Sequence, residues 1–112
     1  MIDQKKLDEI DKEKMYQIYN TWPEIAEKSY NIKFDVTEFG EIDHIVFAGM
    51  GGSGALGDIF ASILSKKDIH VRVVKGYLLP KTVDSDTLVV VTSVSGNTVE
   101  VLNILEQANK MN

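Results

Sequence analysis

Apolar and polar positions along the chain divide it into helical and strand-like segments. From residue 3 to residue 20, apolar residues recur at roughly helical spacing among charged ones, which predicts an amphipathic helix. Pro23 favours the start of a second short helix over 23–30, because proline has no N–H to leave unpaired in a first helical turn. The stretch that follows, up to Asp43, resembles a connector. We therefore expect a helical N-terminal extension over residues 1–43.

The pattern changes at residue 44, where short apolar runs replace the helical spacing. Residues 45–48 form a continuous apolar run that stops at a cluster of glycines, as a buried strand does. Residues 88–91 are also apolar throughout, which is typical of a strand covered on both faces. Between them lies a strand over 71–74 that Arg72 interrupts. One face or edge of that strand should therefore meet water.

Two helices complete this second region. After the glycines, apolar residues form a wide stripe with polar residues on the opposite side, which predicts a helix packed on the sheet through that stripe. The stripe consists of Ala55, Leu56, Ile59, Phe60, Ile63 and Leu64. A last helix is expected over 97–111, where four apolar residues recur at helical spacing.

This order of elements indicates an α/β domain with a parallel sheet, and right-handed crossovers leave few ways to assemble it. We expect a flavodoxin-like sheet of order 2-1-3 with helices on both faces, because the partly polar second strand suits an edge and the apolar third strand suits the interior. A fourth strand should then lie beyond the third, and the sequence contains none. We therefore expect residues 44–112 to be the N-terminal part of a truncated domain, or its open edge to be covered by another chain.

Composition narrows the functions open to this chain. A net charge of -5 and a single arginine argue against a nucleic-acid surface, which needs clustered lysine and arginine. The absence of cysteine excludes disulfides, thiolate metal sites and thiol nucleophiles. The charged N-terminus is unlike a signal peptide, and no apolar run reaches membrane-spanning length. We expect a cytoplasmic protein with no nucleic-acid or membrane partner, no metal and no cofactor.

The turn after the first strand is built largely of glycine. Gly49-Met50-Gly51-Gly52-Ser53-Gly54 lets the backbone approach a ligand closely, and the helix that follows directs free N–H groups toward an anion such as phosphate. The turn also matches the G-x-G-x-x-G spacing of dinucleotide sites, but the second strand ends in Lys75 instead of the acid that binds ribose. A glycine turn that binds no ligand is the alternative interpretation.

A second turn, residues 92–98, carries four hydroxyl groups in seven residues. Hydroxyls and backbone N–H groups can together satisfy the oxygens of a phosphate monoester without a buried lysine. The competing interpretation is helix capping, because Asn97 and Glu100 have the spacing of a capping box. In a 2-1-3 sheet both turns lie at the crevice between strands one and three, where such sheets bind ligands. Two uncharged turns at one crevice are harder to explain by capping than either turn alone.

The stretches Gly49–Asp58 and Ser93–Thr98 resemble the paired signatures of the sugar isomerase (SIS) domain, and closely those of the bifunctional phosphoglucose/phosphomannose isomerases. The resemblance extends from about His44 to the last residue. It implies that the glycine turn lines a sugar site and that the hydroxyl turn holds the sugar's phosphate. The substrate-binding residues expected on this basis are Gly51, Gly52, Ser53, Ser93, Ser95, Gly96, Asn97 and Thr98.

The resemblance further implies a homodimeric isomerase that interconverts glucose 6-phosphate and mannose 6-phosphate with fructose 6-phosphate. This chemistry moves a proton between C1 and C2 through a glutamate base, and the family's catalytic arginine, glutamate, histidine and lysine have no matching positions here. Glu100 lies in the first turn of a helix, where a capping or dipole role is expected. We therefore expect this chain to bind a phosphorylated hexose without turnover and to contain no catalytic residue. The alternatives are a non-catalytic SIS sensor of sugar phosphates and an NADP-binding Rossmann-type domain in which Lys75 faces the 2'-phosphate.

Overall fold

The computed structural model describes residues 3–35 and 37–111, and the chain divides into two compact units, Met1–Thr37 and Glu38–Asn112. The first unit contains the helices α1 (Gln4–Ile10), α2 (Met15–Asn20) and α3 (Trp22–Tyr30). The prediction of one continuous helix from residue 3 to residue 20 is wrong, because the chain turns at Lys14, whose φ is 53°. The carboxylate of Asp11 accepts the backbone N–H of Tyr16 at 2.9 Å, and this bond starts a new helix. The second predicted helix is confirmed as α3.

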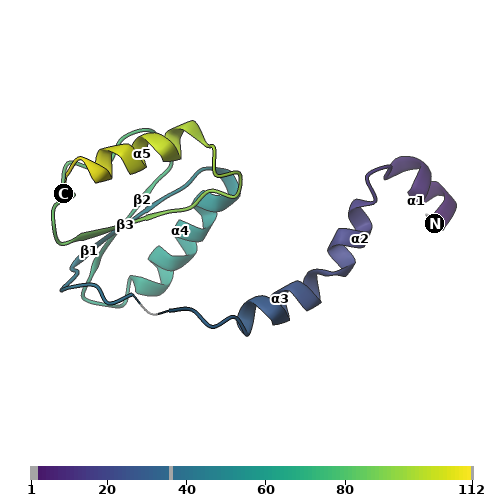
Figure 1. Ribbon diagram of the computed structural model, residues 1–112, viewed down its shortest axis with the longest axis horizontal. Coiled ribbons are helices and arrows are strands. Elements are labelled where there is room, and N and C mark those ends of the chain that lie inside the picture. Colours follow the sequence, from purple (N-terminus) through teal and green to yellow (C-terminus); the bar gives the residue numbers. More distant parts are fainter. Residues whose placement is uncertain (1–2, 36, 112) are drawn as a thin grey trace. The chain divides into compact units, whose positions relative to one another are not determined.

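Three parallel strands form the sheet of the second unit, in the order β2-β1-β3 (Figure 1). The strands are β1 (His44–Ala48), β2 (His70–Val74) and β3 (Thr87–Val91). Their register places Ala48 between Val74 and Val91, so that all three strands end in one row. This confirms the predicted order 2-1-3. The loops that follow the three strands therefore leave the sheet along one side, which we call the carboxyl edge.

The third strand lies at a side of this sheet and not in its interior. Among the residues that the structure describes, no strand pairs with the outer side of β3, and each of its five residues is partly exposed. The interior position expected for β3 depends on a fourth strand that this sequence was expected to lack, so it stays a prediction for a larger sheet. The second strand was expected at an edge, with one face or edge exposed to water. This is confirmed, because β2 lies at the other side of the sheet and Arg72 is exposed.

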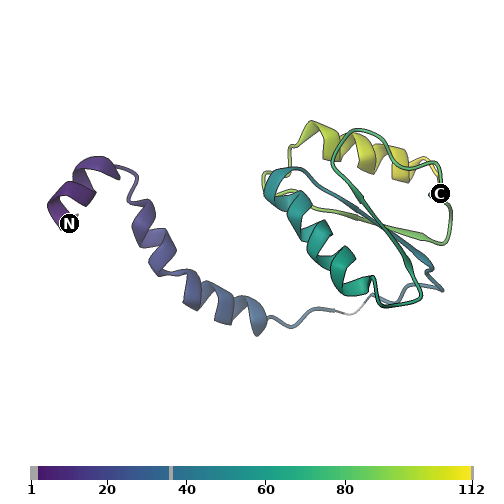
Figure 2. The same cartoon turned by 180° about the vertical axis from the view of Figure 1, so that it is seen from behind.

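Two helices cover opposite faces of the sheet, as predicted. Figure 1 shows α5 (Val99–Asn109) on one face and α4 (Gly51–Leu64) on the other, and Figure 2 shows the same layers from behind. The first of these helices packs on β3, and the second packs on β1 and β2. The buried core between these layers is Val46, Ala48, Val83, Val101 and Ile104.

The face that α4 turns toward the sheet differs from the predicted one. Gly54 and Gly57 are its buried residues. A Cβ atom on Gly57 would lie 2.9 Å from the Cβ of Phe47 and 3.1 Å from a methyl carbon of Val73. The glycines thus let the helix backbone approach the strands closely, and small residues occupy the contact that larger side chains were expected to fill. Four members of the predicted stripe are instead at least 45% exposed: Leu56, Ile59, Phe60 and Ile63.

Candidate functional site

The two candidate turns leave the sheet from neighbouring positions at the carboxyl edge. The N–H of Gly49 donates to the carbonyl oxygen of Val74 at 3.1 Å, and the N–H of Thr92 donates to the carbonyl oxygen of Ala48 at 2.8 Å. These bonds extend both strand ladders one residue beyond the strands themselves. The glycine turn and the hydroxyl turn therefore begin on adjacent strands, and each leads directly into a helix.

The glycine turn follows a backbone course that side chains would block. Gly51 has a φ of 54°, in the left-handed region that favours glycine. A Cβ atom on Gly54 would lie 2.5 Å from the carbonyl oxygen of Gly49, and a Cβ atom on Gly49 would lie 2.9 Å from the carbonyl carbon of Ser53. The turn is thus folded tightly on itself. Its helix begins at Gly51, inside the glycine cluster, whereas the sequence predicted a start after Gly54.

The amino end of α4 is open to a ligand. Its N-cap residue, Met50, makes no side-chain cap. The first N–H groups of a helix have no partner within the helix, and they carry the positive end of its dipole. Gly51 and Gly52 are exposed and Ser53 is half-buried, so these three predicted site residues border accessible N–H groups. Such an end can bind an anion or the hydroxyl oxygens of a sugar.

Three hydroxyl groups of the second turn converge within hydrogen-bond distance of one another. The Oγ of Ser93 lies 3.0 Å from the Oγ1 of Thr98 and 3.4 Å from the Oγ of Ser95, and the last two oxygens are 3.2 Å apart. We call Ser93, Ser95 and Thr98 the hydroxyl triangle. The N–H of Gly96 donates to Ser93 Oγ at 3.1 Å, and the N–H of Asn97 donates to Ser95 Oγ at 3.3 Å. All five predicted residues of this turn are thus gathered into one cluster of donors.

The helix-capping interpretation of the hydroxyl turn is wrong. The N-cap residue of α5 is Thr98, and no side chain caps this helix. Because the helix starts one residue later than a capping box requires, Asn97 and Glu100 do not occupy the paired positions of that motif. The hydroxyls bond to one another and to the N–H groups of their own turn. Gly96 has a φ of 68°, in the left-handed region that favours glycine.

Two carboxylates near the carboxyl edge each have a partner within the chain. The Oδ2 of Asp58, on α4, lies 2.5 Å from the Nζ of Lys75. Glu100, in the first turn of α5, raises the pKa of the Tyr77 hydroxyl, first through its negative charge and then through a hydrogen bond between the two side chains. Both acids are thus engaged by side chains of the loop that follows β2.

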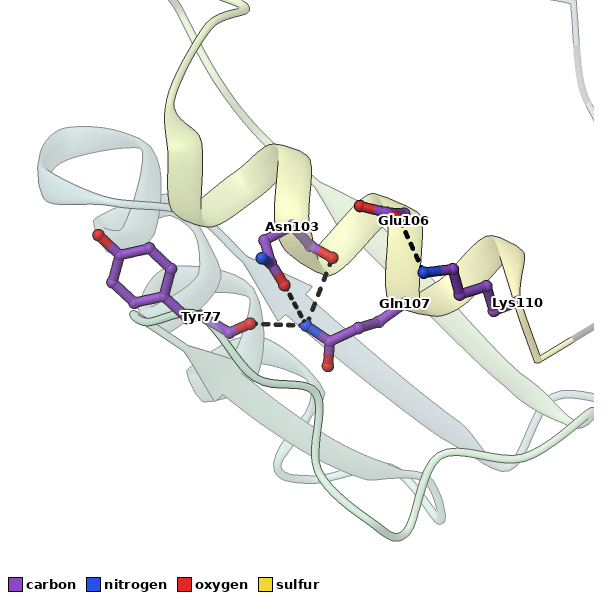
Figure 3. A network of polar contacts seen from close by, with 5 residues as sticks. All are labelled: Tyr77, Asn103, Glu106, Gln107 and Lys110. Atoms are coloured by element: carbon purple, nitrogen blue, oxygen red, sulfur yellow. Dashed lines mark hydrogen bonds and ion pairs between the residues drawn. The ribbon is translucent and has the colours of Figure 1, made fainter.

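That loop, residues 75–79, is a third part of the carboxyl edge that sequence analysis did not assign to the site. Gln107 of α5 binds its backbone at two points, and Figure 3 shows the one at Tyr77. The Nε2 group of Gln107 donates to the carbonyl oxygen of Tyr77 at 2.7 Å, and its Oε1 accepts the N–H of Leu79 at 3.1 Å. Asn103 orients the same amide by accepting from Nε2 at 2.6 Å. The paired residues lie 28 and 30 positions apart in the chain, so no local pattern could reveal them.

Metal-binding clusters and membrane-spanning helices were also sought in the part of the chain that the structure describes. Over residues 3–35 and 37–111, no three His, Asp or Glu side chains gather in a way that would hold a metal ion. Within the same ranges, every helix is too short or too polar to cross a membrane.

Comparison with protein families places both turns within a single family match. The family model of the SIS domain matches residues 38–112, which is more than half of the chain and includes both turns at the carboxyl edge. The chain belongs to the SIS domain family. The match begins where the second compact unit of this SIS chain begins, at Glu38.

Curated relatives of this SIS chain carry the names of enzymes that act on phosphorylated sugars. A bifunctional phosphoglucose/phosphomannose isomerase of Caldicellulosiruptor bescii is 39% identical over 95 residues, which cover 81% of this chain and 28% of the relative. An isomerase of the same name from Aquifex aeolicus is 47% identical over 66 residues, 57% of this chain and 21% of the relative. A D-glucosamine-6-phosphate 4-epimerase of Sulfolobus acidocaldarius is 31% identical over 97 residues, 87% of this chain and 30% of the relative.

The chain spans roughly a quarter of the length of these relatives, between 21% and 30%. No solved structure matches it.

Proposed function

We propose that this chain binds a phosphorylated hexose as the phosphate-holding part of an aldose-ketose isomerase that interconverts glucose 6-phosphate and mannose 6-phosphate with fructose 6-phosphate. The observation that carries the proposal is the hydroxyl triangle, whose oxygens lie 3.0 to 3.4 Å apart at the uncapped start of a helix. Similarity to isomerases named for phosphoglucose and phosphomannose supports the choice of substrate.

The triangle has the chemistry that a phosphate monoester needs. Each hydroxyl of Ser93, Ser95 and Thr98 carries one proton that can rotate away from its neighbours and toward a ligand oxygen. The N–H groups of the same turn and the positive end of the α5 dipole add to the attraction for a dianion. A doubly charged ester can therefore be held by neutral donors, and no lysine or arginine of this turn is required.

The sugar would extend from the triangle toward the glycine turn. Both turns begin on neighbouring strands, and the crevice between such strands is where sheets of this topology bind ligands. In this arrangement Ser93, Ser95, Gly96, Asn97 and Thr98 bind the phosphate. Gly51, Gly52 and Ser53 then face the carbohydrate with the open N–H groups of α4.

We also infer that the chain by itself binds without appreciable turnover. Isomerisation needs a base that can accept a proton from the sugar. Asp58 is paired with Lys75, and Glu100 acts on the Tyr77 hydroxyl, whose pKa it raises chiefly through its negative charge. With both acids engaged in this way, the carboxyl edge is suited to holding a ligand and not to abstracting its protons.

A thermal-shift titration tests the proposed ligand. Fructose 6-phosphate should raise the melting temperature of the chain in a saturable way, because a ligand that binds only the folded state stabilises it. NADP at the same concentrations should not, since residues 75–79 contain no arginine to receive its 2'-phosphate. Stabilisation by NADP alone would contradict the proposal and favour a dinucleotide domain.

A pair of variants locates the binding. Thr98→Val keeps the size of the side chain but removes the hydroxyl that contacts both serines, and it should weaken fructose 6-phosphate binding about tenfold, as expected for one hydrogen bond to a charged group. Ser85→Ala is the control, because that hydroxyl contacts Asp86 at the amino end of β3. Equal affinities of the two variants would contradict a phosphate site at the triangle.

A further inference from the structure

Lys75 is the one basic residue in the three loops of the carboxyl edge. Residues 49–54, 75–79 and 92–98 contain no other lysine and no arginine. Lys75 directly follows β2, at the level of the strand ends from which the glycine turn and the hydroxyl turn also leave. An edge proposed to receive a polar, anionic ligand thus has a single ammonium group in its loops.

The side chain of Lys75 lies across the first turn of α4. Its Cε would be 3.2 Å from a Cβ atom on Gly54, which is buried beneath it. Its Nζ then reaches Asp58, one turn further along the same helix, at 2.5 Å. The stem of Lys75 therefore lies beside Gly54, the last residue of the glycine turn.

This ion pair is accessible, and stability alone is a weak reason for it. The side chains of Lys75 and Asp58 are 47% and 54% exposed. Water screens pairs that are exposed to this extent, and they contribute little to folding. An ammonium has three protons, and the structure gives one of them to Asp58. The other two can be donated to a ligand without breaking the pair.

The sheet geometry determines which end of a ligand Lys75 would meet. Val74 and Val91 both lie beside Ala48, so the ends of β2 and β3 are two strand spacings apart, about 10 Å. A hexose phosphate held by its phosphate after β3 must cross β1 to approach β2. Lys75 would then meet the hydroxyl or carbonyl oxygens at the end of the sugar farthest from the phosphate.

We propose that Lys75 is a ligand-contacting residue for the carbohydrate end of the bound sugar phosphate, and that Asp58 is the positioning residue that holds its ammonium over the glycine turn. This inference rests on the proposed function. It assigns the sugar and the phosphate of one ligand to different loops of the carboxyl edge.

The test compares two ligands on the full 112-residue chain by calorimetric titration: fructose 6-phosphate, which has both ends, and inorganic phosphate, which has only one. Lys75→Met keeps the stem over Gly54 and removes the charge. It should weaken fructose 6-phosphate binding about tenfold, while the affinity for inorganic phosphate changes less than twofold. Lys75→Arg keeps a cation and should retain most of the affinity for fructose 6-phosphate. Asp58→Asn should lower that affinity by a smaller factor, because the ammonium remains but is no longer held.

The outcomes separate this inference from the proposed function. One outcome is that the unmodified chain binds both ligands while Lys75→Met lowers the two affinities equally, or lowers neither. Either result refutes the contact with the sugar, and Lys75 then only links the end of β2 to α4. If the unmodified chain binds neither ligand, the proposed function fails, and the role of Lys75 fails with it. Loss of affinity for fructose 6-phosphate alone, with an unchanged melting temperature, supports the contact.

Discussion

Gly57 shows how one absent side chain determines the distance between a helix and a sheet. The position is buried, and a Cβ atom there would come within 3.1 Å of side chains from both β1 and β2. Gly52, on the same helix, would meet nothing within 4 Å. The two glycines thus have different roles: one allows the helix to approach the sheet, and the other only keeps the amino end of the helix open.

Replacing each glycine by alanine should separate these roles. Gly57→Ala should destabilise the fold by about 1 to 3 kcal/mol, the usual cost of an added methyl group in a packed contact. Gly52→Ala should be neutral or stabilise it by up to about 1 kcal/mol, because alanine favours the helix and reduces the freedom of the unfolded chain. Urea denaturation of both variants measures the difference. Equal stabilities would show that α4 does not pack through Gly57.

Single residues of the site were predictable to different degrees. Ser93, Ser95 and Thr98 could be named because their hydroxyls are concentrated in one short turn before a helix. Whether they cap that helix or face one another depends on where the helix begins, and a shift of one residue decides it. The pair Lys75–Asp58 could not be predicted, because its partners are 17 positions apart and meet only when β2 packs beside α4.

At the scale of helices, the periodic pattern located the elements better than it located their faces. The five elements predicted after residue 43 were confirmed within a few residues, since apolar spacing depends on the local chain. The face of α4 was wrong because the rule assigns large apolar residues to the contact, whereas this helix packs through Gly54 and Gly57. The first helix was predicted too long because the carboxylate of Asp11 competes for a backbone N–H, which the apolar pattern does not record.

Gln107 joins α5 to the loop after β2, and this tie can be tested at the scale of these two elements (Figure 3). Gln107→Leu removes both hydrogen bonds to the loop backbone and should cost about 1 kcal/mol or slightly more. The amide proton of Leu79 should exchange faster, because its acceptor is gone.

Gln107→Glu is the matched variant for that tie. A carboxylate can still accept the N–H of Leu79 but cannot donate to the carbonyl oxygen of Tyr77. Hydrogen exchange at Leu79 should therefore stay close to that of the unmodified chain, although the stability falls. Unchanged exchange at Leu79 in Gln107→Leu would show that the loop is held by other contacts.

At the scale of the α/β unit, the strand order followed from two simple facts. A strand interrupted by Arg72 suits an edge, and right-handed crossovers then leave the order 2-1-3, which the structure has. The same reasoning placed β3 beside a fourth strand. The outer side of β3 is unpaired among the described residues, and its interior position stays a prediction, because apolar composition reports what a strand can bury and not what lies beside it. The convergence of both turns at one edge was predictable, because it depends only on the strand order.

A sugar-phosphate site at the carboxyl edge requires that two turns from neighbouring strands bind one ligand. Amide chemical shifts measured by NMR during titration with fructose 6-phosphate test this most directly. We predict that the amides of Gly51 and Gly52 move together with those of Gly96 and Asn97, and that all four follow a single dissociation constant. Movement confined to one turn, or two different constants for the two turns, would contradict a shared sugar-phosphate site at the carboxyl edge.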